Sequence, residues 1–281
     1  MGVPRRAFGG SGVGLSALAL GTMRLAPPKF DADSAVALLL HLSDHGVTSF
    51  HVSHEYDSYD FACSALAALR RARPAAPIEV IAKLAAPHFD ETHFSARRLR
   101  THIEALLQRL PAERVDVVQW MVRHTPNDDT PRLAILERDG AAVAEAAQML
   151  KAEGKIGALA VFPYGEPFRR AVLAESFVDG LVDYLNPSEL EAAPWLDALH
   201  ARRQGFVAMR PLFAGNLSRD PATVDAALRF PLLHPATAAI VVSLSDVAQA
   251  SQAIAAAATP ADADAFREAL AGYEGPGGRG G

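Results

Sequence analysis

Eight short apolar runs alternate with eight amphipathic stretches along this chain of 281 residues. Apolar runs such as residues 115–121, with the sequence Val-Asp-Val-Val-Gln-Trp-Met, are typical of strands buried on both faces of a parallel sheet. Eight strand–helix pairs in one chain favour a closed barrel over an open sheet. We therefore predict an α/β fold, a (β/α)8 TIM barrel.

The expected strands lie at residues 18–23, 47–52, 78–83, 115–121, 156–162, 181–185, 205–210 and 238–243. The expected helices lie at about 33–45, 58–71, 95–109, 140–153, 166–176, 191–203, 221–229 and 247–257. Helix-boundary residues agree with this assignment. Asp31 or Asp33 can cap the first helix and Ser95 the third, and Gly46 and Gly154 stand where helices should end.

The two ends of the chain have their own patterns. A glycine-rich segment at 8–16, Phe-Gly-Gly-Ser-Gly-Val-Gly-Leu-Ser, predicts a hairpin turn. A dinucleotide-binding glycine loop is the alternative, but that motif needs a helix directly after it, and here a strand-like run follows. A last helix is expected at 261–273, followed by a glycine-rich tail. We expect one domain over 1–273 and a disordered tail at 274–281.

Composition narrows the class of protein. The chain has 27 Lys and Arg against 32 Asp and Glu, with no basic run, which argues against a nucleic-acid surface. Its apolar runs are too short to span a membrane. Cys63 is the single cysteine, so no disulfide framework can form, which suits a reducing compartment. We expect a cytoplasmic protein that acts on a small molecule, as a monomer or weak homo-oligomer.

Barrel enzymes place their chemistry at the carboxyl ends of the strands. Lys83 closes an apolar strand, where burial disfavours its charge unless the site uses it. Tyr56 follows the preceding strand, and a neighbouring ammonium would stabilise its phenolate and make it a better proton donor. His51 and His124 lie at the ends of the second and fourth strands. These four residues are the candidate catalytic groups.

Five segments together resemble the aldo-keto reductase family over nearly the whole chain. They are residues 8–23, 44–50, 110–116, 154–156 and 210–217. The resemblance implies NADPH-dependent reduction of aldehydes and ketones. In that family a Tyr protonates the carbonyl oxygen, a Lys lowers the pKa of the Tyr, an Asp pairs with the Lys, and a His orients the substrate. Tyr56 matches the tyrosine and Lys83 the lysine.

The other family positions differ. His51 stands where the family has Asp, and Met121 where it has His, so that His124, three residues on, is the nearest replacement. A thioether cannot donate a hydrogen bond to a carbonyl. The Ser-Asn pair that binds the nicotinamide amide is Phe162-Pro163 here, and the expected Gln falls near Val182.

The resemblance also implies positions for NADP(H). The loop at 210–217, with Arg210, Leu212, Gly215 and Leu217, is expected to hold phosphate through backbone N–H groups. Two positions at the eighth strand–helix unit complete the expected cofactor contacts, Ser243 and Gln249. The family's closing Glu-Asn pair, which holds the adenine end, is Gln252-Ala253.

Three functions remain open. The first is a nicotinamide-dependent carbonyl reductase that uses Tyr56 and Lys83. The second is an isomerase, dehydratase or cyclase that uses Tyr56, Lys83 and His51 without hydride transfer. The third is a non-catalytic binding or regulatory protein. His51 is either a proton-transfer partner or a buried, hydrogen-bonded histidine. We predict no metal site, and we expect Trp120 to adjoin the active site.

Overall fold

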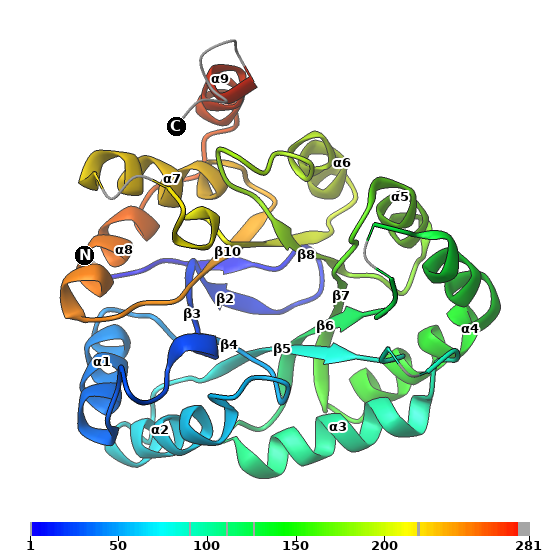
Figure 1. Ribbon diagram of the computed structural model, residues 1–281, viewed down its shortest axis with the longest axis horizontal. Helices are drawn as coiled ribbons and strands as arrows, with labels where there is room; N and C mark the ends of the chain where they lie inside the picture. The colour runs from blue at the N-terminus through cyan, green and yellow to red at the C-terminus, as the bar shows by residue number, and fades with distance from the viewer. Residues whose placement is uncertain (1, 90, 111, 126, 218–219, 275–281) are drawn as a thin grey trace.

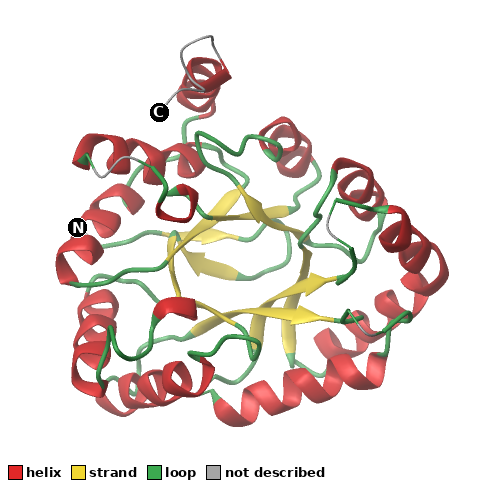
Figure 2. Cartoon of the chain, viewed as in Figure 1, coloured by secondary structure: helices red, strands yellow, loops and turns green. Residues whose placement is uncertain are grey.

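The computed structural model describes residues 2–89, 91–110, 112–125, 127–217 and 220–274 (Figure 1). Eight parallel strands close into a barrel in the order β10-β3-β4-β5-β6-β7-β8-β9. Figure 2 shows the strands at the centre with the helices around them. The predicted (β/α)8 barrel is therefore confirmed. The expected tail lies outside the described residues except for Glu274, which ends the last helix.

The barrel strands agree with the expected runs to within a few residues. Their bounds are β3 Leu18–Gly21, β4 Ser49–Val52, β5 Glu79–Ala85, β6 Val115–Met121, β7 Ile156–Val161, β8 Gly180–Tyr184, β9 Gly205–Met209 and β10 Thr237–Val242. Three of the predicted bounds differ by two residues, one of them the start of the second strand at Ser49 instead of residue 47, and most of the others differ by one. The first strand ends early because a 3-10 helix, η1, occupies Thr22–Arg24, and the third continues past Lys83 to Ala85.

Helices cover the outside of the barrel. Their bounds are α1 Ala32–Asp44, α2 Tyr59–Ala72, α3 Ala96–Arg109, α4 Thr130–Ala152, α5 Glu166–Ala174, α6 Leu196–Ala201, α7 Pro221–Leu233, α8 Val247–Ala257 and α9 Ala263–Glu274, with 3-10 helices η2 Ala193–Trp195 and η3 Phe213–Gly215. The predicted caps are present. Asp31 and Ser95 accept hydrogen bonds from the first turns of α1 and α3. Gly46 and Gly154 follow α1 and α4 with φ of 83° and 71°.

The start of α4 differs most from expectation, because ten residues before position 140 are also helical. These residues are rich in charge, which hides their apolar stripe. Arg132 lies among them and is fully buried. Its guanidinium donates to the backbone oxygens of Val122, His124 and Thr125, and so ties the start of α4 to the loop after β6.

The predicted hairpin is present and closes the amino-terminal end of the barrel. Strands β1 Arg5–Ala7 and β2 Gly14–Ser16 pair antiparallel. Phe8, at the turn, is fully buried against the starts of two barrel strands. A Cβ atom at Gly205 would lie 2.4 Å from the Phe8 ring. Because the turn leads into a strand, the dinucleotide-loop interpretation does not apply.

Two apolar layers form the core. Small and branched side chains fill the barrel interior, among them Ala19, Ile81, Val117 and Val207. A larger layer packs between the strands and the surrounding helices. No described helix has the length and apolar composition needed to cross a membrane. The hairpin blocks the amino-terminal end, so the open end of the barrel is the one where the strands finish.

Candidate functional site

Three polar side chains form the next layer of the barrel interior, between its apolar layer and the carboxyl ends of the strands. Ile81 and Val117 point inward, and side chains two residues apart on a strand share a face. Lys83 and Gln119 are therefore also inward, and they are register partners on β5 and β6. His51 on β4 reaches the same interior, because its Nε2 lies 2.7 Å from Oε1 of Gln119. The candidate site thus begins with a polar layer near the carboxyl end of the barrel.

A carboxylate from the loop after β4 joins this layer. Oε2 of Glu55 lies 3.1 Å from Nζ of Lys83, and it also accepts from the Arg123 guanidinium. The three side chains are largely buried, with exposed fractions of 16% for Glu55 and Lys83 and 19% for Arg123. Lys83 therefore has a carboxylate partner, although the strand position held by Asp in the family carries His51. Sequence reasoning did not identify Glu55 as the partner of Lys83, and it missed Arg123, because these contacts depend on loop geometry.

The pKa shifts in this cluster follow from two cations sharing one anion. Burial alone raises the pKa of Glu55, but Lys83 and Arg123 outweigh it and hold that pKa below its usual value. Burial lowers the pKa of Lys83, and Glu55 only partly opposes this because Arg123 repels the ammonium. Glu55 is thus firmly ionised, while Lys83 holds its proton less tightly than a free lysine.

Tyr56 lies between the lysine and the histidine. Nζ of Lys83 is 4.8 Å from the centre of the Tyr56 ring. The Tyr56 hydroxyl oxygen is 3.5 Å from Nδ1 of His51, at the outer limit of a hydrogen bond. Because Nε2 of His51 donates to Gln119, Nδ1 is the acceptor nitrogen. His51 is therefore placed to receive the hydroxyl proton of Tyr56.

Burial is the largest influence on the pKa values of both Tyr56 and His51. It raises the pKa of Tyr56, the negative charge of Glu55 raises it further, and Arg123 opposes them. The sequence led us to expect the opposite direction, with Lys83 lowering the pKa. Burial, together with a smaller effect of the Lys83 charge, lowers the pKa of His51 to about 4 despite the bond to Gln119. At neutral pH the structure holds a protonated phenol beside a neutral imidazole.

Two neighbouring residues lie differently from what the sequence led us to expect. Nδ1 of His124 accepts a hydrogen bond from the backbone of Thr125, and no hydrogen bond links His124 to Tyr56 or Lys83 within the described residues. Arg123, one position earlier, points to the cluster instead. Trp120 does not adjoin the site either. It alternates with the inward residues of β6, and it is fully buried in the outer layer near Phe94 and Phe177.

Apolar and aromatic side chains line the next layer of the barrel mouth. The buried members are Ala85, Met121 and Phe162, and the half-buried members are Tyr164, Tyr184 and Met209. The ring of Phe162 makes edge contacts with Tyr164 and Tyr184, with ring centres 4.8 Å and 5.1 Å apart. Met121 and Phe162 are two of the positions where the resemblance implies polar groups. At those two positions the expected nicotinamide site therefore offers apolar side chains that cannot hydrogen-bond an amide.

The loop after β9 has an unusual backbone. Arg210, Phe213 and Ala214 have φ of 55°, 47° and 56°, a left-handed region that is rare for residues with side chains, and Gly215 has φ of 90°. A Cβ atom at Gly215 would meet no atom within 4 Å, so the loop presents open backbone there. This shape suits a phosphate. However, the N–H groups of Phe213, Gly215 and Asn216 donate to carbonyls within the loop.

Cations flank this loop. The guanidinium of Arg210 pairs with Glu189 at 3.0 Å and lies 4.5 Å from the centre of the Tyr184 ring. Arg24 reaches the carbonyl of Ala214 from the opposite side, at 3.4 Å. Leu212 is half-buried against the outer core layer. Leu217 lies at the end of the described part of the loop. Arg24 is the cation of this region that sequence reasoning did not single out.

The last expected cofactor positions lie at the end of β10. Ser243 donates to the carbonyl of Gly21 at 3.3 Å. Gln249 is exposed in the first turn of α8, where its side chain accepts from the backbone of Ser245. Asp246 caps the same turn, so a carboxylate occupies the amino end of α8, where a helix would otherwise favour an anion. The Asp246 carboxylate would oppose the binding of an anionic group at that helix end.

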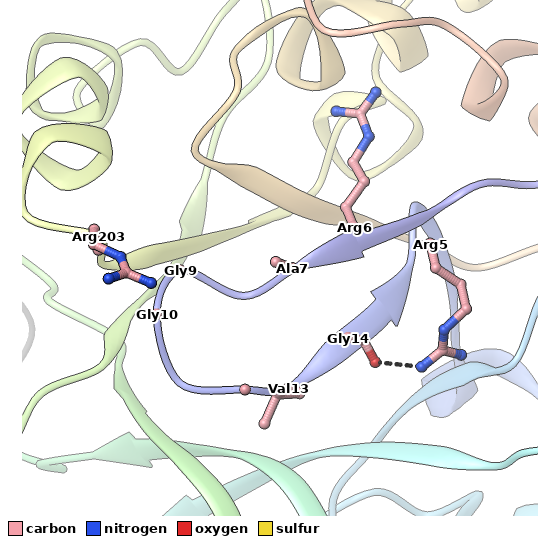
Figure 3. A pocket seen from close by; sticks show the side chains of 9 residues that line it. Arg5, Arg6, Ala7, Gly9, Gly10, Val13, Gly14 and Arg203 are labelled. Atoms are coloured by element: carbon pink, nitrogen blue, oxygen red, sulfur yellow. Dashed lines mark hydrogen bonds between the residues drawn. The ribbon is translucent and has the colours of Figure 1, made fainter.

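A hollow of about 350 Å³ lies at the other end of the barrel. It is lined by both hairpin strands and by Arg203 (Figure 3). The hairpin contacts the starts of the barrel strands, so this hollow is separated from Tyr56 and Lys83 by the packed interior. We therefore place the candidate active site at the carboxyl end of the barrel.

Comparison with known proteins agrees with this geometry. The sequence model of the aldo/keto reductase family matches residues 17–220. The crystal structure of a protein from Pseudomonas aeruginosa that is described as an aldo-keto reductase has 24% sequence identity to this chain. Its TM-score is 0.71, over 90% of this chain and 94% of that one. The holo form of an aldo-keto reductase from Bacillus halodurans is 17% identical, with a TM-score of 0.77 over 99% of this chain and 100% of the other.

A third structure is an aldo/keto reductase from Klebsiella pneumoniae in complex with NADP and acetate. It is 18% identical to this chain, with a TM-score of 0.73 over 98% of this chain and 97% of that one. At these identities the three structures show a shared fold. No curated protein matches the chain in sequence.

Proposed function

The chain belongs to the aldo/keto reductase family, and from this premise we propose that it reduces the carbonyl group of a small aldehyde or ketone. Tyr56 is the proton donor, and Lys83 stabilises the negative charge that develops on its oxygen. NADP(H) is the proposed source of the hydride, held between the barrel mouth and the loop after β9.

The observation that carries this proposal is the position of Tyr56. Its hydroxyl lies at the open end of the barrel, with the Lys83 ammonium 4.8 Å from the ring centre and Arg123 acting on the same phenol. A tyrosine whose pKa is raised by burial keeps its proton at neutral pH, which is the state that a general acid needs. The two nearby cations would then stabilise the phenolate as the proton leaves.

The proposed reaction adds one hydride to the carbonyl carbon and one proton to the carbonyl oxygen. When bound, the reduced nicotinamide supplies a hydride to the carbonyl carbon. The O–H bond of Tyr56 breaks as its proton bonds to the carbonyl oxygen, and the carbonyl becomes an alcohol. The Tyr56 phenolate then takes a proton from solvent. His51 accepts the Tyr56 hydrogen bond at Nδ1 while Gln119 holds its Nε2–H, so the pair orients the phenol between turnovers.

The phosphate end of the loop supports cofactor binding better than the nicotinamide end. Left-handed backbone, the open side of Gly215 and the cations Arg24 and Arg210 suit a dinucleotide phosphate. At the other end, Met121 and Phe162 replace polar groups that the resemblance implies, and the neighbouring aromatic rings provide stacking contacts for the nicotinamide ring. We therefore expect weaker cofactor binding than the family pattern provides.

A second candidate function follows from this apolar mouth. Tyr56, Lys83 and His51 would catalyse an isomerisation, dehydration or cyclisation of a carbonyl compound without nicotinamide. The observation that favours it is the replacement of the amide-binding pair by Phe162 and Pro163, because proline also lacks a backbone donor.

A titration with NADPH separates these functions. We would follow the fluorescence of NADPH rather than of the protein, because Trp120 is remote from the mouth. Saturable binding, with oxidation of NADPH on adding an aldehyde, would support the reductase. Tyr56→Phe should reduce turnover about 100- to 10,000-fold. Tyr59→Phe on α2 is the matched control and should leave turnover unchanged.

Three other results would contradict the reductase proposal, and two of them would support another function. Failure to bind either NADPH or NADH would exclude the reductase. Turnover of a carbonyl compound without nicotinamide, abolished in Tyr56→Phe, would establish the second candidate. A folded chain that neither binds nicotinamide nor loses its biological effect in Tyr56→Phe would be a non-catalytic binding protein.

A further inference from the structure

The charges of the Glu55 cluster do not cancel. Lys83 and Arg123 both pair with the same oxygen of Glu55, so two cations share one carboxylate. His51 faces the cluster as a neutral ring, because its pKa lies far below neutrality. Nearby cations outside the cluster have carboxylate partners of their own: Arg210 pairs with Glu189, and Arg132 with Asp129. Among the described residues, the Glu55 cluster therefore contains two cationic side chains and one carboxylate.

Hydrogen-bond donors around the mouth also lack partners. In the described part of the chain, Nε of Arg123, the hydroxyl of Tyr164 and Nε2 of Gln119 are buried and have no hydrogen-bond acceptor. Oε1 of Glu55 is also without a hydrogen bond, and Nε2 of His88 lies 3.9 Å away. Buried donors are rarely left unpaired in proteins. Three such donors near an excess cation match a ligand that brings acceptor oxygens.

Arg123 connects these donors to the reaction centre. Its charge acts on the phenols of both Tyr56 and Tyr164, so its guanidinium lies within electrostatic reach of both. Glu55 binds the terminal nitrogen Nη2 and leaves Nε–H for another acceptor. Arg123 and Tyr164, from the loops after β6 and β7, thus supply two unpaired donors of the kind that bind a carboxylate.

We propose that the substrate is a small oxo acid, whose carbonyl oxygen meets Tyr56 and whose carboxylate binds Nε of Arg123 and the hydroxyl of Tyr164. This inference rests on the proposed function, because it names the substrate class of the same site. Met121 and Phe162 form an apolar wall beside these polar groups. Arg123 is then a specificity-determining residue that contacts the substrate.

Matched acids and esters test the proposal. Pyruvate and methyl pyruvate share a carbonyl and differ in one negative charge, and 4-oxopentanoate and its methyl ester repeat the comparison with a longer spacing. Calorimetric titration would measure their binding without nicotinamide. At least one acid should bind tenfold or more tightly than its ester, in line with the strength of charge-assisted hydrogen bonds (roughly 10- to 100-fold).

Three variants locate the binding site. Arg123→Met should remove the preference for the acid, and it leaves Lys83 and Glu55 as a balanced pair, so the fold should be retained. Tyr164→Phe removes only an unpartnered hydroxyl and should weaken acid binding about threefold to tenfold. Arg97→Met removes an exposed positive charge on α3 and should change nothing.

The outcomes separate this inference from the reductase itself. Esters that bind as tightly as the acids would overturn the oxo-acid proposal, as would an acid preference that survives in Arg123→Met. Oxidation of NADPH with both esters and acids at equal rates would retain the reductase and reject the anion site. Arg123-dependent binding of an acid, without any NADPH oxidation, would retain the anion site and reject the reductase.

Discussion

The carboxylate of Glu55 lies 3.1 Å from the ammonium of Lys83, although Glu55 belongs to a loop and Lys83 to a barrel strand. The resemblance places the partner of this lysine on the preceding strand, where the chain has His51. Glu55 precedes Tyr56 directly, so the residue that pairs with the lysine is the chain neighbour of the proposed proton donor. The ion pair has thus moved from a rigid strand to the loop that carries the tyrosine.

Replacing Glu55 should destabilise the fold more than replacing an exposed carboxylate. Glu55→Gln leaves two largely buried cations side by side, which should lower the free energy of unfolding by about 2 kcal/mol. Asp44→Asn removes an exposed partner of Arg73 and should change it by less than about 1 kcal/mol. Urea denaturation of both variants measures the difference, and equal effects would show that the Glu55 cluster contributes little.

The sequence was informative about the barrel for a physical reason. Strands such as β6 are buried on both faces, so their apolar runs begin and end where the strands do. Helix α4 was only half predicted, because its first turns carry charges and a fully buried arginine whose partners are loop carbonyls. Periodicity records burial of apolar side chains, and it does not record a cation buried among backbone oxygens.

The same limit applies to the candidate site. Tyr56 and Lys83 were found from their positions near strand ends, and the structure places Lys83 over the Tyr56 ring. Glu55 and Arg123 lie in loops, where side-chain direction is set by backbone turns that have no periodic signal. This is why His124 was preferred to Arg123, one residue away. A buried lysine without an acidic strand neighbour was the available sign that a loop carboxylate must face it.

Acid should destabilise the native chain through His51. Its folded pKa of about 4 lies below the unfolded value of 6.5, so the neutral ring stabilises the fold above pH 6.5 and that contribution is lost as the pH falls towards 4. Between pH 7.5 and 4.5 the loss is about 2 to 3 kcal/mol.

Burial also lowers the pKa of His234, so the measurement must isolate the contribution of His51. Urea unfolding at several pH values should show that His51→Gln loses about 2 to 3 kcal/mol less than the native chain on acidification. If His51 kept an ordinary pKa, the free energies of unfolding of the native chain and the variant would change in parallel with pH.

The packing of the β1–β2 hairpin against the barrel depends on glycine at the starts of β8 and β9. A Cβ atom at Gly180 would lie 2.0 Å from the backbone oxygen of Gly205 and 2.7 Å from the Phe8 ring. Because a backbone oxygen cannot move aside as a side chain does, Gly180→Ala should lower the free energy of unfolding by at least about 3 kcal/mol. Gly272→Ala, in open space on α9, is the control and should raise it by about 0.5 kcal/mol. Similar stability of the two variants would mean that the strand starts are not closely packed.

Restoring polar groups at the barrel mouth should strengthen nicotinamide binding. The double variant Phe162→Ser with Pro163→Asn supplies two side chains that can hydrogen-bond an amide, and it returns a backbone N–H. Two such bonds, at about 1 kcal/mol each, correspond to roughly 30-fold in affinity. Removing Phe162 also opens space among Met121, Tyr164 and Tyr184, which by itself admits a ligand more easily.

The control must therefore open the same space without adding polar groups. Phe162→Ala with Pro163→Ala does this, and it also returns the backbone N–H, so a comparison of the two double variants isolates the side-chain hydrogen bonds. NADPH fluorescence titration should give a dissociation constant about tenfold lower or more for the Ser-Asn variant than for the Ala-Ala variant. Equal dissociation constants would show that the nicotinamide ring does not reach Phe162, and that any dinucleotide bound by the loop after β9 lies outside the barrel mouth.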